Sequence, residues 1–160
     1  MRRNPRPEGR AALDDAVPEK AVTIRIEGHA PDVRLASNDR GNLHWGARTG
    51  LVNAEFDKAH WLYKAFFQGD VPLRYTAPVT VAFKVRMGRE YGVRLATRDV
   101  DNLSGACKVW LDALTTGRGN RDGLGLLVDD SPRWVRGVSY ELDTTDGEAY
   151  IKITITPWKG

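Results

Sequence analysis

Residues 78–87 alternate between large apolar side chains and small or polar ones, and this alternation constrains the fold more than any other feature. Successive side chains of a β-strand point to opposite faces of its sheet, so the pattern predicts a strand with one buried face. A sheet with one buried face needs a second layer packed on it. The apolar members of the stretch are Val79, Val81, Phe83, Val85 and Met87.

Three further segments have the same two-residue period. Residues 21–28 place Val22, Ile24 and Ile26 on one side, which predicts another half-buried strand. Residues 134–142 and 148–157 flank a short stretch of Asp, Thr and Gly, and we expect them to form a pair of strands around a turn.

Two segments have helical spacing. In residues 53–68 apolar side chains recur every three or four positions, with Asn53 as the expected cap. A second helix is expected from Asp101 or Asn102 to about Thr116. Residues 31–51 are expected to form a long loop, and residues 117–125, with four glycines, a flexible one.

The predicted order is therefore strand, helix, strand, helix and two strands. It favours an α/β (α+β) fold, with a single mixed sheet and two main helices packed on it. At 160 residues the chain is one domain. We expect residues 1–20, rich in Arg, Pro and Gly, to be a disordered basic tail, and residues 21–160 to form the domain.

The location predicted from composition is the cytoplasm. The single cysteine, Cys107, excludes an intramolecular disulfide and is expected to be buried and inert. The basic start of the chain is not followed by an apolar run, so we expect no signal peptide. No stretch approaches the roughly 18 apolar residues that a membrane span needs.

Positive charge gathers in one part of the chain, which has a net charge of +3. The stretch that holds these cations contains a single acid, Glu90, and two aspartates, Asp99 and Asp101, follow it in the sequence. Cations beside a carboxylate core suit a metal-dependent nuclease, in which the cations hold phosphates and the acids hold the metal. An arginine-rich, solvated strand and loop explains the charge equally well. The cations are Lys84, Arg86, Arg89, Arg94 and Arg98.

Carboxylates are concentrated in the same region and just after it. Asp99 and Asp101 stand two apart, so in an extended segment they point to the same side. Clustered carboxylates stay ionised together beside a divalent cation, and oxygen ligands favour Mg²⁺ or Mn²⁺. The acids concerned are Asp99, Asp101, Asp112, Asp129 and Asp130.

Plain structural interpretations of these acids stay open. An Asp-x-Asp-Asn run before a helix is also typical of a capping turn. Asp129 and Asp130, followed by Ser-Pro, suit a polar turn. Asp112 stands four residues after Lys108, the spacing of an ion pair on a helix surface.

Taken together, the motifs resemble those of the RusA-type Holliday junction resolvases. These motifs are Asp99-Val100-Asp101-Asn102-Leu103, then Lys108 with Asp112-Ala113-Leu114, then Asp129-Asp130. Upstream, Ser37-Asn38-Asp39-Arg40 and His44-Trp45 resemble the family's N-terminal loop. The resemblance covers roughly residues 21–157.

The resemblance implies a homodimeric, Mg²⁺-dependent endonuclease that cuts four-way DNA junctions by paired, symmetric nicks. Asp99, Asp101 and Asp130 would be its metal-binding and catalytic carboxylates, and Lys108 its catalytic lysine. A two-fold dimer suits a junction that is itself nearly two-fold symmetric. A less selective flap or fork nuclease, or a non-catalytic DNA-binding protein with the same fold, are the alternatives.

Two intervals depart from the family pattern. From Asp101 to Lys108 the chain is about three residues longer, which puts the role of Lys108 in question. The glycine-rich stretch before Asp129 is also longer, and could add junction contacts or only slack. The DNA-binding residues we expect are Arg98, Arg86, Lys84, Arg40, His44, Arg118 and Arg121.

Overall fold

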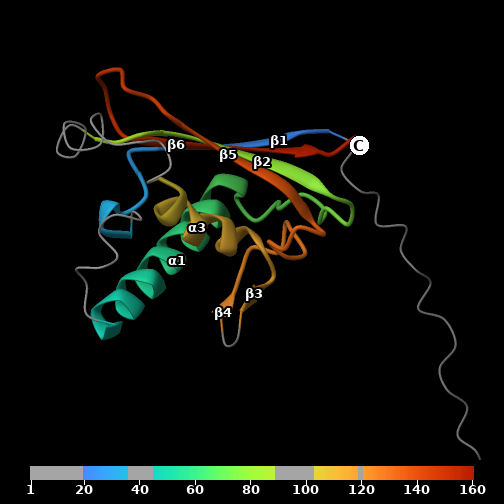
Figure 1. The fold of residues 1–160 in the computed structure, drawn as a ribbon, viewed down its shortest axis with the longest axis horizontal. Helices are drawn as coiled ribbons and strands as arrows, with labels where there is room; N and C mark the ends of the chain where they lie inside the picture. The colour runs from blue at the N-terminus through green and yellow to red at the C-terminus, as the bar shows by residue number, and fades with distance from the viewer. Residues whose placement is uncertain (1–19, 36–44, 89–102, 119–120) are drawn as a thin grey trace, which may run out of the picture.

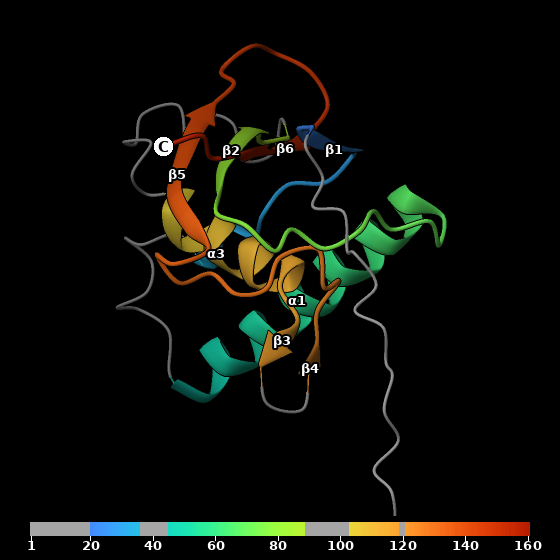
Figure 2. The same ribbon diagram turned by 90° about the vertical axis from the view of Figure 1, so that its right-hand side faces the viewer.

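A four-stranded sheet forms one layer of the molecule and two helices form the other (Figures 1 and 2). The computed structural model describes residues 20–35, 45–88, 103–118 and 121–160, and of Trp45 and Arg118 only the backbone. The strands are β1 (Val22–Glu27), β2 (Val79–Arg86), β5 (Val135–Leu142) and β6 (Tyr150–Pro157). The helices are α1 (Trp45–Phe67) and α3 (Leu103–Leu114), with a short 3-10 helix, η1 (Val33–Leu35).

The sheet is mixed, with the strands in the order β1-β6-β2-β5. β2 runs parallel to β5 and antiparallel to β6, and β6 is antiparallel to β1. The alternation in β2 has the predicted effect, since Val79, Val81, Phe83 and Val85 are all buried. The predicted fold class, one mixed sheet carrying two helices in this order, is confirmed.

The expectation that the last two strands pair with each other was wrong. β2 lies between β5 and β6, so the connection from Asp143 to Ala149 must pass the end of β2. Arg86, the last residue of β2, holds this connection by donating to Asp143 at 3.0 Å and to Thr145 at 2.7 Å. Hydrogen bonds from Thr145, Tyr150 and Arg86 hold the pKa of Asp143 well below its ordinary value.

Helix α1 begins eight residues before the predicted start, so most of the second half of the predicted loop 31–51 is helical. Gly46, Gly50 and Asn53 are poor helix formers, which is why the sequence favoured a loop there. Tertiary contacts outweigh this, because Leu51 and Val52 pack against the core and Arg121 donates to the Asn53 carbonyl at 3.4 Å.

The glycine-rich stretch is not wholly irregular, as the sequence had suggested. Its ends pair as a two-stranded ribbon of β3 (Gly117–Arg118) and β4 (Arg121–Asp122), which projects on the side away from the sheet (Figure 1). Gly123 stands directly after the ribbon, and a β-carbon there would lie 2.0 Å from the Thr115 carbonyl oxygen. Glycine is therefore required where the chain turns back onto α3.

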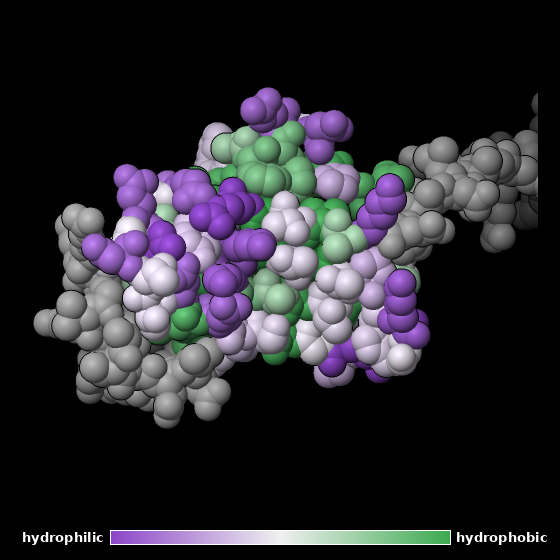
Figure 3. All heavy atoms as spheres, turned by 90° about the horizontal axis from the view of Figure 1, so that it is seen from above, coloured by the Kyte–Doolittle hydropathy of each residue, from purple (hydrophilic) through white to green (hydrophobic). Residues whose placement is uncertain are grey.

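The sheet face opposite the helices is open. Seen from that side, hydrophilic residues gather over one end of the sheet, and residues of intermediate hydropathy cover much of its middle (Figure 3). Lys84 on this face pairs with Glu141 of the neighbouring strand at 2.7 Å. No helix in the described ranges is long and apolar enough to cross a membrane.

We predict that Gly123→Ala lowers the free energy of unfolding by roughly 2–3 kcal/mol, because the backbone must move away from Thr115. Gly50→Ala is the matched control. Gly50 is exposed on α1, and a β-carbon at this position would meet nothing within 4 Å, so alanine there should be neutral or stabilise by up to about 1 kcal/mol. Urea unfolding of both variants measures the difference. Equal stabilities would contradict the close approach at Gly123.

Candidate functional site

Helix α3 presents two opposite faces, and one of them is fixed on α1. The indole N–H of Trp110 donates to the buried Glu55 carboxylate at 2.8 Å, and the Tyr63 hydroxyl donates to the Trp110 carbonyl at 2.9 Å. Residues two apart on a helix point in nearly opposite directions. With Trp110 held against α1, Lys108 and Asp112 lie on the other side of α3.

The chain after α3 folds back along the helix. Backbone N–H groups of Leu124 and Leu127 donate to the carbonyls of Ala113 and Leu114, at 2.8 and 3.0 Å. These bonds satisfy carbonyls that the end of a helix leaves without a partner. The returning segment is also held by the chain before β2, because the backbone N–H of Tyr75 donates to the Leu126 carbonyl at 2.9 Å. The returning chain thereby carries Asp129 and Asp130 back to the side of α3.

The two sequence-predicted residues Lys108 and Asp130 meet here. The Lys108 ammonium contacts the carboxylates of both Asp112 and Asp130, although Asp130 is 22 residues away in the chain. The side chain of Asp130 is only 11% exposed, against 25% for Asp112 and 41% for Lys108. Asp129 points elsewhere and accepts the backbone N–H of Asp130 at 2.8 Å. Of the two aspartates, Asp130 is therefore the one that contacts Lys108.

Charge at the site is set by these three residues. Partial burial alone lowers the pKa of Lys108, and the hydrogen bonds and charges of Asp112 and Asp130 outweigh it and raise the pKa above the ordinary 10.5. Lys108 therefore carries its full positive charge at neutral pH. The structure also bears out the plain interpretation of Asp112, an ion pair at the i, i+4 spacing, in addition to the contact with Asp130.

Carboxylate oxygens are the donors that Mg²⁺ prefers, so the chemistry of Asp130 and Asp112 fits this ion. Within the described ranges, no three His, Cys, Asp or Glu side chains stand close enough together to hold a metal. The remaining predicted ligands, Asp99 and Asp101, lie outside the described residues. They directly precede Leu103, the first residue of α3, so the motif joins the fold at the helix that carries Lys108.

Of the predicted DNA-binding residues, the structure describes the side chains of three, Lys84, Arg86 and Arg121, and Arg121 lies apart from the other two. Lys84 and Arg86 lie on the open sheet face and are used in contacts within the fold, with Glu141 and with Asp143 and Thr145. Arg121, beside the turn of the β3–β4 ribbon, pairs with Asp57 of α1. Their role toward DNA stays a prediction. Of the others, Arg98, Arg40 and His44 lie outside the described residues, as does the side chain of Arg118.

Glu55 is a buried carboxylate that positions α3 and that the sequence patterns did not single out. It is 4% exposed and also accepts the Asp32 backbone N–H at 3.0 Å, while Lys58 pairs with it at 2.8 Å. A signal was available. Glu55 stands four residues before Ala59 and eight before Tyr63, on the apolar stripe of α1, where a carboxylate must find internal donors.

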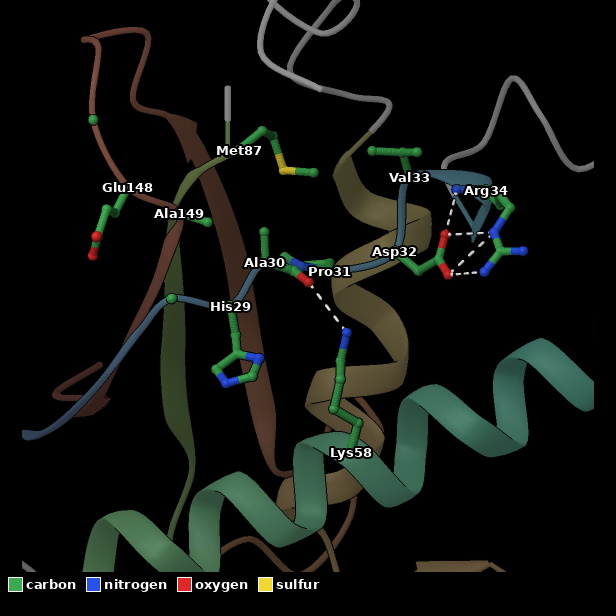
Figure 4. A pocket seen from close by; sticks show the side chains of 13 residues that line it. His29, Ala30, Pro31, Asp32, Val33, Arg34, Lys58, Met87, Glu148 and Ala149 are labelled. Carbon is green, nitrogen blue, oxygen red and sulfur yellow. Dashed lines mark hydrogen bonds and ion pairs between the residues drawn. The ribbon is translucent and has the colours of Figure 1, made fainter. Parts of the chain in front are cut away.

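A hollow of about 1030 Å³ lies at the end of the sheet where β1 and β2 finish (Figure 4). Two cations that line the hollow already have partners within the fold, since Lys58 donates to the Ala30 carbonyl and Arg34 pairs with Asp32. Its wall includes Gly88, the last described residue before the acidic motif, and η1, which contacts α3. This end of the molecule therefore holds both attachment points of the motif.

Comparison of the sequence with models of known protein families and with curated proteins finds no match.

Cys107, expected to be buried, is fully enclosed on α3, and burial raises the pKa of its thiol. A thiol of this kind is unreactive, which removes it from the candidate chemistry.

We predict that Asp130→Asn lowers the pKa of Lys108, because a neutral amide no longer stabilises the ammonium ion. Stability from this contact is complete below the ordinary pKa of 10.5 and is lost as pH rises through the raised value, so the variant should lose less stability in that alkaline range. An NMR titration of the lysine side chains measures the pKa. Asp129→Asn is the control, since its amide oxygen can still accept the Asp130 N–H. An unchanged Lys108 pKa in Asp130→Asn would contradict the contact.

Proposed function

We propose that this protein is a Mg²⁺-dependent endonuclease that cuts branched DNA, with four-way junctions as its main substrate. The observation that carries the proposal is the contact between Lys108 and Asp130. The sequence motifs selected both residues for this chemistry, and they lie side by side in the fold although 22 positions separate them.

The carboxylates have a defined part in this proposal. Asp99, Asp101 and Asp130 would hold the magnesium ion, with Asp130 placed by the chain that returns along α3. When bound, Mg²⁺ lowers the pKa of a water molecule and stabilises the negative charge that develops on a cleaved phosphodiester. Burial of Asp130 and its ion pair hold the carboxylate in one position, which suits a ligand.

Lys108 supplies a fixed positive charge at the same place. The two carboxylates that raise its pKa keep the ammonium ion protonated at neutral pH. A cation next to a metal site stabilises a phosphate that carries extra charge in the transition state. The contact of Lys108 with Asp130 supports this role despite the longer interval between Asp101 and Lys108.

The resemblance of the motifs to RusA-type Holliday junction resolvases supports the choice of substrate. On this basis we propose that the protein acts as a homodimer and makes one nick in each of two opposed strands. A four-way junction has nearly two-fold symmetry, so a two-fold dimer presents one site to each strand.

We predict that Asp130→Asn lowers the rate of junction cleavage at least 100-fold, about the effect of removing one group from a charge-stabilising site. Asp129→Asn is the matched control and should keep cleavage within a few-fold of the unchanged protein, because Asp129 faces the backbone rather than Lys108. A labelled synthetic junction in Mg²⁺ and in EDTA measures both. Equal cleavage by the two variants would contradict the proposed site.

We predict that Asp101→Asn abolishes cleavage while junction binding is kept or improved, since it removes a negative charge near the phosphates. Binding is measured by gel shift, and cleavage on matched junction, flap and duplex substrates. Paired symmetric nicks confined to the junction support a resolvase. Equal cutting of flaps favours the less selective nuclease, and binding without cleavage by the unchanged protein favours a non-catalytic DNA-binding protein.

A further inference from the structure

The chain that follows Asp130 builds a second basic surface, which the charge pattern of the sequence did not single out. A turn in which Trp134 and Val135 donate to the Ser131 carbonyl, both at 2.9 Å, leads from Asp130 into β5. Arg133 stands in this turn and Arg136 follows at the start of β5, and both are exposed. Two tryptophans accompany them, Trp134 beside Arg133 and Trp158 beside Arg136.

The two tryptophans lie on either side of the start of β2. The Val79 N–H donates to the Trp134 carbonyl and the Trp158 N–H donates to the Pro78 carbonyl, both at 2.9 Å. The start of β5 and the end of β6 consequently lie at the same end of the sheet, on either side of the start of β2 (Figure 1). Residues far apart in the sequence are thereby joined into one surface, to which the exposed Lys159 adds a third cation.

Each arginine lies over a tryptophan ring, in a cation–π contact, rather than in an ion pair with an acid. The guanidinium carbon of Arg133 lies 5.1 Å from the centre of the Trp134 ring, and that of Arg136 lies 5.1 Å from the centre of the Trp158 ring. Across the described part of the chain, neither arginine nor Lys159 has a carboxylate within 4.0 Å. By contrast, the cations Lys84, Arg86 and Arg121 all have such partners. The hydrogen-bonding edges of Arg133 and Arg136 are therefore available to an anion.

We propose that Arg133, Trp134, Arg136 and Trp158, with Lys159, form a surface that binds a DNA strand leading away from the cleavage site. This rests on the proposed function. The cation–π contact holds each guanidinium in place while its N–H groups bind phosphate oxygens. Trp158 is 46% exposed, so it also offers its own face to an unpaired base at a branch point.

The distance from Asp130 fits this role. Arg133 stands three positions after Asp130, so their Cα atoms are at most about 11 Å apart. A DNA strand advances about 3.4 Å for each nucleotide. A strand whose scissile phosphate lies at the proposed metal site of Asp130 therefore brings a phosphate a few nucleotides away within reach of Arg133.

Binding of a fluorescein-labelled four-way junction, measured by anisotropy in EDTA at several salt concentrations, tests the proposal without cleavage. The variant Arg133→Gln with Arg136→Gln should raise Kd about tenfold or more near 0.1 M salt and reduce the slope of log K against log salt by about two. The control, Lys20→Gln with Lys64→Gln, makes the same charge change at two exposed positions, one just before β1 and one on α1. It should change Kd less than twofold.

Trp158→Phe provides a second readout, because the fall in tryptophan fluorescence on adding the junction should be smaller in this variant. A doubly substituted arginine variant that binds within twofold of the unchanged protein, with the same salt slope, would overturn the proposal.

Cleavage in Mg²⁺ separates this proposal from the function on which it rests. If the unchanged protein binds through the two arginines but never cuts DNA, the surface is correct and the nuclease is not. If both the unchanged protein and the arginine variant bind and cut equally well, the nuclease stands and the surface is wrong. If the unchanged protein binds neither junction nor duplex, both proposals are wrong.

Discussion

The position of α3 depends on one buried contact, the hydrogen bond from the Trp110 indole to the Glu55 carboxylate. A buried carboxylate is costly unless several donors satisfy it, and Glu55 receives three, from Trp110, the Asp32 backbone and Lys58. Their shared acceptor ties α1, α3 and the chain before η1 into one unit. Because this contact fixes one face of α3, the opposite face turns Lys108 toward the returning chain and Asp130.

Much of the fold could be predicted from the sequence, because it depends on local periodicity. The alternation in residues 78–87 and around Ile24 predicts buried strand faces, and the sheet has them. What periodicity cannot supply is which strands are neighbours. β2 lies between β5 and β6 because the chain crosses over through α3 to reach the parallel strand β5. The contacts of Arg86 that secure the connection from β5 to β6 join residues nearly 60 positions apart.

The candidate site shows the same division. Lys108 and Asp130 could be selected from their motifs, and the fold brings them together. The position of Glu55 on the apolar stripe of α1 is a signal in the sequence, but its main donor, Trp110, lies on another helix and only the fold reveals it. The arginines in cation–π contact at the start of β5 were equally hidden, since Trp158 reaches Arg136 only through the pairing of β6 with β2. Charge runs in the sequence pointed to Lys84 and Arg86, which the fold pairs with its own acids.

The most direct test of the account is to place Mn²⁺ at the site in solution, as a paramagnetic substitute for Mg²⁺. Broadening of assigned backbone NMR signals reports which residues lie close to the bound ion. We predict that the signals of Asp130 and Lys108 broaden at low Mn²⁺ concentration, before those of other acids such as Glu141 or Asp57. Signals of Asp130 and Lys108 that stay sharp while other regions broaden, or that stay sharp throughout, would contradict a metal site at this contact.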